Sequence, residues 1–115
     1  MNYNVVFHID REEPLSLKIA LGNIKNLFKE IENGQAVILA NFKAPLLFLK
    51  NNIDHEIYES LKNIKKTNVK VYICENSLMM LNISKGDIID ECEFVRAGIV
   101  KLIELDVEGF AYIKP

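Results

Sequence analysis

The sequence predicts a three-layer α/β domain, in which a mainly parallel five-stranded sheet lies between helices on both of its faces. Short apolar runs of strand length alternate with segments whose apolar residues recur at spacings of three and four. The runs are almost continuously apolar, which is typical of parallel strands covered on both sides. Right-handed crossovers between such strands place helices on both faces of the sheet.

Five runs are expected to form the strands. They are residues 4–9, 35–40, 69–73, 93–95 and 110–113. The third run is rich in β-branched and aromatic residues and contains neither proline nor glycine, so it suits the interior of a sheet. The second run follows Asn33 and Gly34 directly, a pair that is a strong stop signal for the preceding helix.

The helical segments lie between these runs. The first helix is expected to start near Pro14 and Ser16 and to carry its apolar stripe from Leu17 to Ile31. Two later helices are expected around residues 53–64 and 78–83. A last helix begins at Ala97 and Gly98, and its apolar residues gather on one side; they are Ile99, Val100, Ile103 and Val107.

Residues 44–49 have the sequence APLLFL, with Pro45 in the position of a first-turn residue. A short helix without a polar face has to be buried all round, and one small domain offers little room for that. We therefore expect a neighbouring subunit to cover this segment.

Length and composition indicate one domain that spans residues 1–115. Half of the residues are apolar, which is enough for a buried core, and the net charge of −2 gives no reason to expect a nucleic-acid partner. No apolar run approaches the length of a membrane helix, and no basic segment leads into an apolar one at the N-terminus. A cytoplasmic protein without a membrane association is the expectation.

Cys74 comes at the end of the third strand, immediately before a predicted helix. In open α/β sheets, ligands bind at the edge where the strands have their carboxyl ends. The positive end of a helix also lowers the pKa of a nearby thiol, which increases its nucleophilic thiolate fraction. Asn76 and Ser77 follow as candidate helix caps. The alternative for Cys74 is a small buried apolar residue, and the acidic Glu75 next to it opposes a lowered pKa.

The loops after the first three strands share one edge of the predicted sheet. His8, Asp10 and Asn41 are therefore expected near Cys74. His8 is a candidate proton donor or a group that stabilises an anionic sulfur, although a structural role at a strand end is the alternative. Asn41, Asn76 and Ser77 are candidate hydrogen-bond donors to a bound anion, with turn and cap formation as their alternative.

Neither a metal site, nor a nucleotide or flavin cofactor, nor a disulfide is expected. The two histidines and two cysteines lack the spacings of a zinc site, so no metal is predicted. No glycine-rich loop follows the first strand, which argues against a nucleotide or flavin cofactor. Cys92 is expected to pack as an apolar residue near the opposite edge of the sheet, too far from Cys74 for a disulfide.

Several motifs together resemble the DsrE/DsrF-like proteins, nearly end to end and in the right order. They are VVFHID, ALGNIKNLFKE, CENSL, VRAGIVKLIEL and EGFAYIKP. The resemblance implies a five-stranded, flavodoxin-like α/β fold, trimers or hexamers, and in the characterised relatives a sulfur-relay role in which a cysteine carries sulfur as a persulfide or thiosulfonate. Matched by motif, that cysteine is Cys74.

One departure from the family concerns the turn after the second strand. The family commonly has a glycine-containing turn there, whereas this chain has Asn41, Phe42, Lys43 and Ala44. Phe42 is expected to crowd backbone that glycine leaves open, which affects the shape of the pocket. The sequence is therefore compatible with two functions. The first is a sulfur carrier or sulfurtransferase-like protein that receives sulfur on Cys74 from a donor protein and passes it to an acceptor thiol; the second is an oligomeric binding or assembly module without sulfur chemistry.

Overall fold

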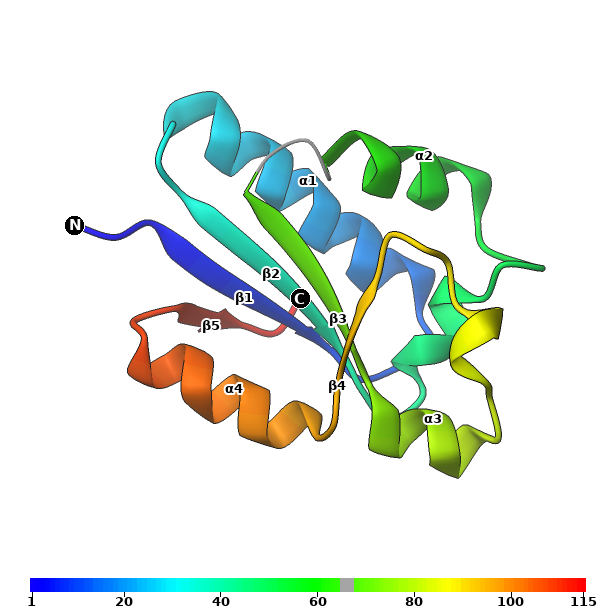
Figure 1. The fold of residues 1–115 in the computed structure, drawn as a ribbon. Coiled ribbons are helices and arrows are strands. Elements are labelled where there is room, and N and C mark those ends of the chain that lie inside the picture. Colours follow the sequence, from blue (N-terminus) through cyan, green and yellow to red (C-terminus); the bar gives the residue numbers. More distant parts are fainter. Residues whose placement is uncertain (65–67) are drawn as a thin grey trace.

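A five-stranded sheet forms the centre of the molecule in a computed structural model that describes residues 1–64 and 68–115. The strands are β1 (Asn4–Ile9), β2 (Gln35–Ala40), β3 (Val69–Cys74), β4 (Glu93–Val95) and β5 (Ala111–Ile113). Their order across the sheet is β4-β3-β2-β1-β5, and each neighbouring pair is parallel (Figure 1). The predicted parallel sheet is confirmed.

Helices cover both faces of this sheet, as predicted for a three-layer α/β fold (Figure 1). On one face, α1 (Pro14–Glu30) and α2 (His55–Ile64) pack against each other; on the other face, α4 (Gly98–Val107) packs over β2 and β3. A short helix, α3 (Glu75–Leu81), follows β3 without a loop. Two 3₁₀-helices, η1 (Ala44–Phe48) and η2 (Lys85–Asp87), complete the chain.

Alternation along the strands divides the core between the two faces. Val5 and Phe7 of β1 belong to the larger apolar cluster, which includes the buried residues of α1 and α2. Val6, between them, belongs to a smaller cluster with Leu39 of β2 and Leu105 of α4. Successive side chains of a strand point to opposite faces, so near-continuous apolar runs supply both clusters.

The segment at residues 44–49 corrects one expectation. Ala44 and Phe48 are completely buried within this chain, so no neighbouring subunit is needed to cover η1. The cover comes from the residues that follow η2. Ile88 and Ile89 are buried in the same apolar cluster, the backbone N–H of Ile89 donates to the carbonyl of Phe48 at 3.0 Å, and Leu49 forms an antiparallel bridge with Ile88.

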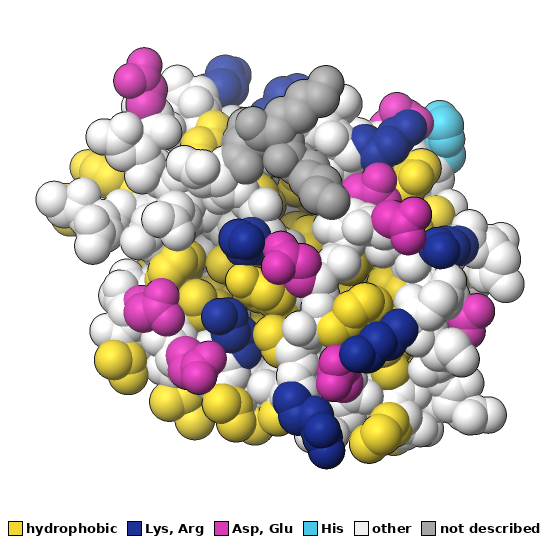
Figure 2. Space-filling view, viewed as in Figure 1, with side chains coloured by type: hydrophobic (Ala, Val, Ile, Leu, Met, Phe, Trp, Pro, Cys, Tyr) yellow, Lys and Arg dark blue, Asp and Glu magenta, His cyan; other side chains and the backbone are white. Residues whose placement is uncertain are grey.

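The outer side of α4 is apolar and exposed. Ile99, Val100, Ile103 and Val107 do share one side, as expected, but they are 62%, 53%, 58% and 82% exposed. The buried side of the helix is supplied by Leu105. Figure 2 shows hydrophobic side chains exposed along the lower left margin, where Figure 1 places α4. This exposed set is called the α4 apolar face below.

Candidate functional site around Cys74

Cys74 is the last residue of β3 and occupies the N-cap position of α3, where it makes no side-chain capping hydrogen bond. It lies at the sheet edge formed by the carboxyl ends of the strands, beside Val95 of β4. Asn76 and Ser77 were expected as caps, and this was wrong. Because β3 continues into α3 with no intervening loop, the helix starts at Glu75, and Asn76 and Ser77 lie inside its first turn.

Several donors surround the sulfur of Cys74. The backbone N–H of Gly98, the first residue of α4, donates to Cys74 Sγ at 3.3 Å. Burial raises the pKa of this thiol, since Cys74 is only 5% exposed, but hydrogen bonds from the Ser77 hydroxyl and from the N–H groups of Gly98, Ser77 and Asn76 outweigh it and lower the pKa below the ordinary 9.0. The site therefore raises the thiolate fraction of Cys74 above that of an ordinary cysteine at the same pH.

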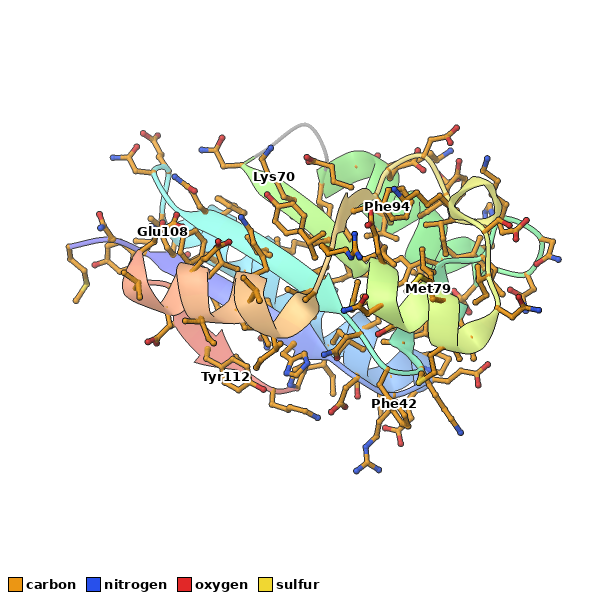
Figure 3. The ribbon with its side chains drawn as sticks, turned by 60° about the horizontal axis from the view of Figure 1, so that its bottom comes forward. Phe42, Lys70, Met79, Phe94, Glu108 and Tyr112 are labelled. Atoms are coloured by element: carbon orange, nitrogen blue, oxygen red, sulfur yellow. The ribbon has the colours of Figure 1, made fainter. Side chains whose placement is uncertain are left out.

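Ser77 connects the thiol to the loop after β2. Its side chain is buried, and its Oγ accepts a hydrogen bond of 2.8 Å from the backbone N–H of Phe42. The same hydroxyl lowers the pKa of the Cys74 thiol, so one side chain links the thiol to this loop. Phe42 has a left-handed backbone (φ 52°) and a half-exposed ring, which Figure 3 shows at the end of the molecule where α3 lies.

Glu75 forms an ion pair that compensates its charge. Its carboxylate lies 2.6 Å from the ammonium group of Lys85 in η2. The same ammonium lies 5.3 Å from the centre of the Phe94 ring. A carboxylate paired with a cation opposes a neighbouring thiolate less than a free carboxylate does. Glu75 therefore opposes a lowered pKa of Cys74 less than the sequence alone suggests.

His8 and Asn41 meet directly, as the shared sheet edge predicts. His8 Nε2 lies 2.8 Å from Asn41 Oδ1, and His8 Nδ1 lies 2.6 Å from the hydroxyl of Tyr112 in β5. Because an amide oxygen only accepts, Nε2–H donates to Asn41 Oδ1, while the tyrosine hydroxyl and Nδ1 share the second hydrogen bond. Both ring nitrogens are thus engaged, which fixes the orientation of the imidazole.

Gly98 connects the two groups of residues. A β-carbon placed on Gly98 would lie 3.4 Å from Asn41 Cβ, so the Asn41 side chain packs against the same glycine that donates to Cys74. Asn41 in turn binds His8. Cys74, Ser77, Asn41 and His8 therefore form one connected set, whereas the side chain of Asn76 is exposed to solvent.

A polar groove adjoins this set, between the ends of β1 and β5. It has a volume of about 270 Å³, and its lining includes His8, Asp10, Arg11 and Lys114. Lys114 Nζ donates to Asp10 Oδ1 at 2.8 Å, and this hydrogen bond lowers the pKa of the Asp10 carboxyl below its ordinary value. Asp10 is thus held by a residue 104 positions away.

Two residues of the site were missed by the sequence analysis, Tyr112 and Gly98. Tyr112 reaches His8 because β5 lies beside β1, and periodicity carries no signal for that strand order. Gly98 was noted as the start of a helix, and the signal that could have identified it is the choice of glycine at a first helical position, where glycine has no conformational advantage.

Residues 1–64 and 68–115 contain no group of three or more His, Cys, Asp or Glu side chains that could hold a metal ion. Over the same residues, no helix combines the length and the apolar character needed to cross a membrane. Cys74 and Cys92 are both buried and are not joined by a disulfide.

The fold and site define a class of protein: a parallel α/β domain with a buried, hydrogen-bonded thiol at the carboxyl edge of its sheet. A family comparison identifies the class more closely. The model of the DsrE/DsrF-like family matches residues 5–115, and the chain belongs to this family. No curated protein matches the chain.

Two solved structures share the fold over the whole chain. A protein of unknown function from Methanobacterium thermoautotrophicum, MTH1491, has 24% sequence identity and a TM-score of 0.87, with 99% of this chain and 100% of that chain covered. The ychN protein from E. coli has 18% identity and a TM-score of 0.78, with both chains fully covered. At these identities the likeness establishes the fold.

Proposed function

We propose that this chain is a small cytoplasmic sulfur carrier that holds sulfane sulfur on Cys74. The observation that supports the proposal most is the hydrogen-bonding of the thiol at the carboxyl edge of the sheet, which lowers its pKa despite burial. A thiolate is the nucleophile in thiol exchange. Membership of the DsrE/DsrF-like family suggests a role related to sulfur relay, which agrees with this chemistry.

The proposed reaction has two steps, each an exchange at sulfur. In the first, the Cys74 thiolate attacks the outer sulfur of a donor persulfide; the new bond joins Cys74 Sγ to that sulfur, the S–S bond of the donor breaks, and the donor leaves as a thiolate. In the second, an acceptor thiolate attacks the outer sulfur of the Cys74 persulfide, and Cys74 leaves as a thiolate. Neither step requires a metal or a redox cofactor.

The neighbouring residues are assigned supporting roles. Ser77 and the first-turn N–H groups, including that of Asn76, stabilise negative charge on sulfur. Asn41 and Tyr112 position His8, and we propose that His8 exchanges one of these hydrogen bonds for one to the sulfur anion that leaves the donor. Donor and acceptor proteins are the proposed partners, and the low net charge agrees with partners other than nucleic acid.

We also propose that the chain assembles into a trimer or hexamer through the α4 apolar face. This face replaces residues 44–49 as the candidate interface, since η1 is buried in its own chain. Exposed apolar residues that adjoin along one helix mark a contact surface rather than a scattered set.

The decisive experiment is mass spectrometry of the intact protein after incubation with a persulfide donor. A sulfur carrier gains the mass of one sulfur atom, the Cys74→Ser variant gains none, and Cys92→Ser, the matched control, still gains it. Release of that mass by an added acceptor thiol completes the relay. A wild-type protein that stays unmodified under conditions in which the donor transfers sulfur to a free thiol would rule the carrier out.

One pair of observations favours a second function, an oligomeric binding or assembly module without sulfur chemistry. Cys74 is only 5% exposed, while the α4 apolar face is broadly exposed. A protein of this kind would show no sulfur adduct in the same experiment yet would still assemble through α4. The mass measurement therefore separates the two functions.

A further inference from the structure

Gly98 places its N–H group where the sulfur of Cys74 can accept it. It is the first residue of α4, and the N–H groups of a helix's first turn have no partner within the helix. In this fold the N–H of Gly98 donates to Cys74 Sγ, across 3.3 Å between two elements separated by 24 positions in the chain. The helix start and the strand end are therefore held together at the thiol.

The space beside Gly98 is tight for a β-carbon. A β-carbon at this position would lie 3.1 Å from Leu39 Cδ2 and 3.4 Å from Asn41 Cβ. Leu39 is 0% exposed and packed in the core between the sheet and α4, so it has little freedom to yield. An added methyl group needs a shift of a few tenths of an ångström, and because Leu39 is held by the core, we expect the start of α4 to move away from β2 and the hydrogen bond to Cys74 to lengthen.

Backbone conformation does not explain the glycine. Gly109 has a positive φ of 91°, whereas the φ of Gly98 lies outside the left-handed region that favours glycine. The first position of a helix also tolerates most residues, and glycine weakens a helix relative to alanine. The close approach between α4, Leu39 and Asn41 is the remaining physical reason for glycine at this position.

We propose that Gly98 is a positioning residue for the sulfur chemistry of Cys74: the absence of a side chain lets α4 approach closely enough for the Gly98 N–H to hold the thiolate. This inference rests on the proposed function, because it concerns how the same thiol is made reactive. It assigns α4 a part in the reaction, beyond its role as a cover for the sheet.

The first test compares the alkylation rate of Cys74 in the wild type and in Gly98→Ala. A displaced donor stabilises the thiolate less, so the rate at neutral pH is expected to fall about three- to tenfold. At a pH high enough to ionise the thiol fully, the two rates are expected to converge. Gly22→Ala and Gly86→Ala are matched controls, since a β-carbon at either position meets no atom within 4 Å.

A rescue variant distinguishes displacement of α4 from general damage. Leu39→Val removes the δ-carbons, including the atom that a β-carbon on Gly98 would meet at 3.1 Å. Combined with Gly98→Ala, it is expected to restore much of the lost alkylation rate. A double variant that reacts no faster than Gly98→Ala alone, although both unfold at the same temperature, contradicts the proposed crowding.

A measurement on the wild type keeps the inference testable even if Gly98→Ala does not fold. In NMR spectra recorded across pH, the amide proton of Gly98 is expected to shift with the same midpoint as the alkylation rate of Cys74, and Cys74→Ala is expected to abolish that shift. If the chemical shift of the Gly98 amide proton does not change as Cys74 ionises, the inference is wrong, whereas the proposed carrier function is unaffected. Normal hydrogen bonding at Gly98 with no sulfur transfer overturns the carrier function instead.

Discussion

Burial and hydrogen bonding act in opposite directions on the Cys74 thiol, and the balance decides its chemistry. An apolar surrounding alone would raise the thiol pKa and leave an inert buried side chain. The donors from Ser77 and Gly98 reverse that effect. Cys74 thus combines low exposure with a stabilised thiolate, a combination that suits a sulfur atom kept from solvent between exchanges.

Ser77→Ala tests the balance at this residue. Removal of the hydroxyl takes a hydrogen bond from the thiolate and leaves the N–H of Phe42 without its acceptor. We expect the pKa of Cys74 to rise and the unfolding free energy to fall by about 1–2 kcal/mol. Iodoacetamide labelling across pH measures the first effect, and urea unfolding measures the second. Ser77→Thr, which keeps a hydroxyl, is the control; a Ser77→Ala variant with wild-type labelling would contradict the assignment.

Phe42 gives a second prediction at the residue scale. Its left-handed backbone costs a residue with a β-carbon about 1–2 kcal/mol, which glycine does not incur. The glycine-containing turn that is common in the family fits the same conformation.

Phe42→Gly is accordingly expected to raise the unfolding free energy by about 1 kcal/mol, after the entropy that glycine adds to the unfolded chain. Phe42→Ala removes the same ring and keeps the β-carbon, so it is the matched control and is expected to give no such gain. Equal effects of the two substitutions in urea unfolding would show that the ring, and not the backbone, determines the stability here.

The sequence predicts much of this site but not its inner contacts. Cys74, His8 and Asn41 were placed at one edge because parallel strands share it, and the His8–Asn41 contact confirms the shared edge for that pair. Cys74, and not Asn76 or Ser77, occupies the N-cap position of α3, because the helix begins at Glu75. That boundary varies by a residue or two in any sequence-based assignment.

At the scale of elements, α4 and η1 reverse the expected division between core and interface. Both segments are rich in apolar residues, and composition alone does not reveal which of them a neighbouring element covers. The residues after η2 fold over η1, while nothing among the described residues covers the outer side of α4. Loop paths of this kind depend on tertiary packing, which periodicity does not encode.

Ile103→Glu tests the role of the α4 apolar face. Ile103 is exposed in the single chain, so a glutamate there should not disturb the fold. In an assembly through α4, the same charge would be buried in the interface, which is costly. We expect the substitution to reduce the molar mass measured by light scattering to that of the monomer and to leave far-ultraviolet circular dichroism unchanged. Leu15→Glu, at an exposed apolar position of α1, is the control and should assemble normally. An Ile103→Glu variant with the wild-type mass would remove α4 as the interface.

At the scale of the whole molecule, the sheet joins distant parts of the chain into one site. His8 and Tyr112 are 104 positions apart, yet their side chains meet because β5 completes the sheet beside β1. The number, type and approximate bounds of the strands follow from the sequence, and the structure agrees with them. The order of the strands does not follow, because each apolar run would fit several positions in a parallel sheet.

The global stability is expected to depend on pH through Cys74. A thiol whose folded pKa lies below its unfolded value contributes stability that is fully present above the unfolded pKa, near 9.0, and is lost as the pH falls through the folded pKa. The difference in unfolding free energy between the wild type and Cys74→Ser should therefore grow in favour of the wild type as the pH rises toward 9.0. Urea unfolding in the presence of a reductant measures it, and a constant difference would contradict a lowered pKa.

The position of β5 also has a consequence for synthesis of the protein. Until residues 111–113 emerge from the ribosome, one margin of β1 has no strand to pair with, although β2 to β4 can already assemble on its other side. An unpaired margin of this kind attracts strands from other nascent chains. Pairing of the three-residue β5 with Val5–Phe7 thus leaves only a short strand at this edge of the sheet, and it also delivers the tyrosine that contacts His8.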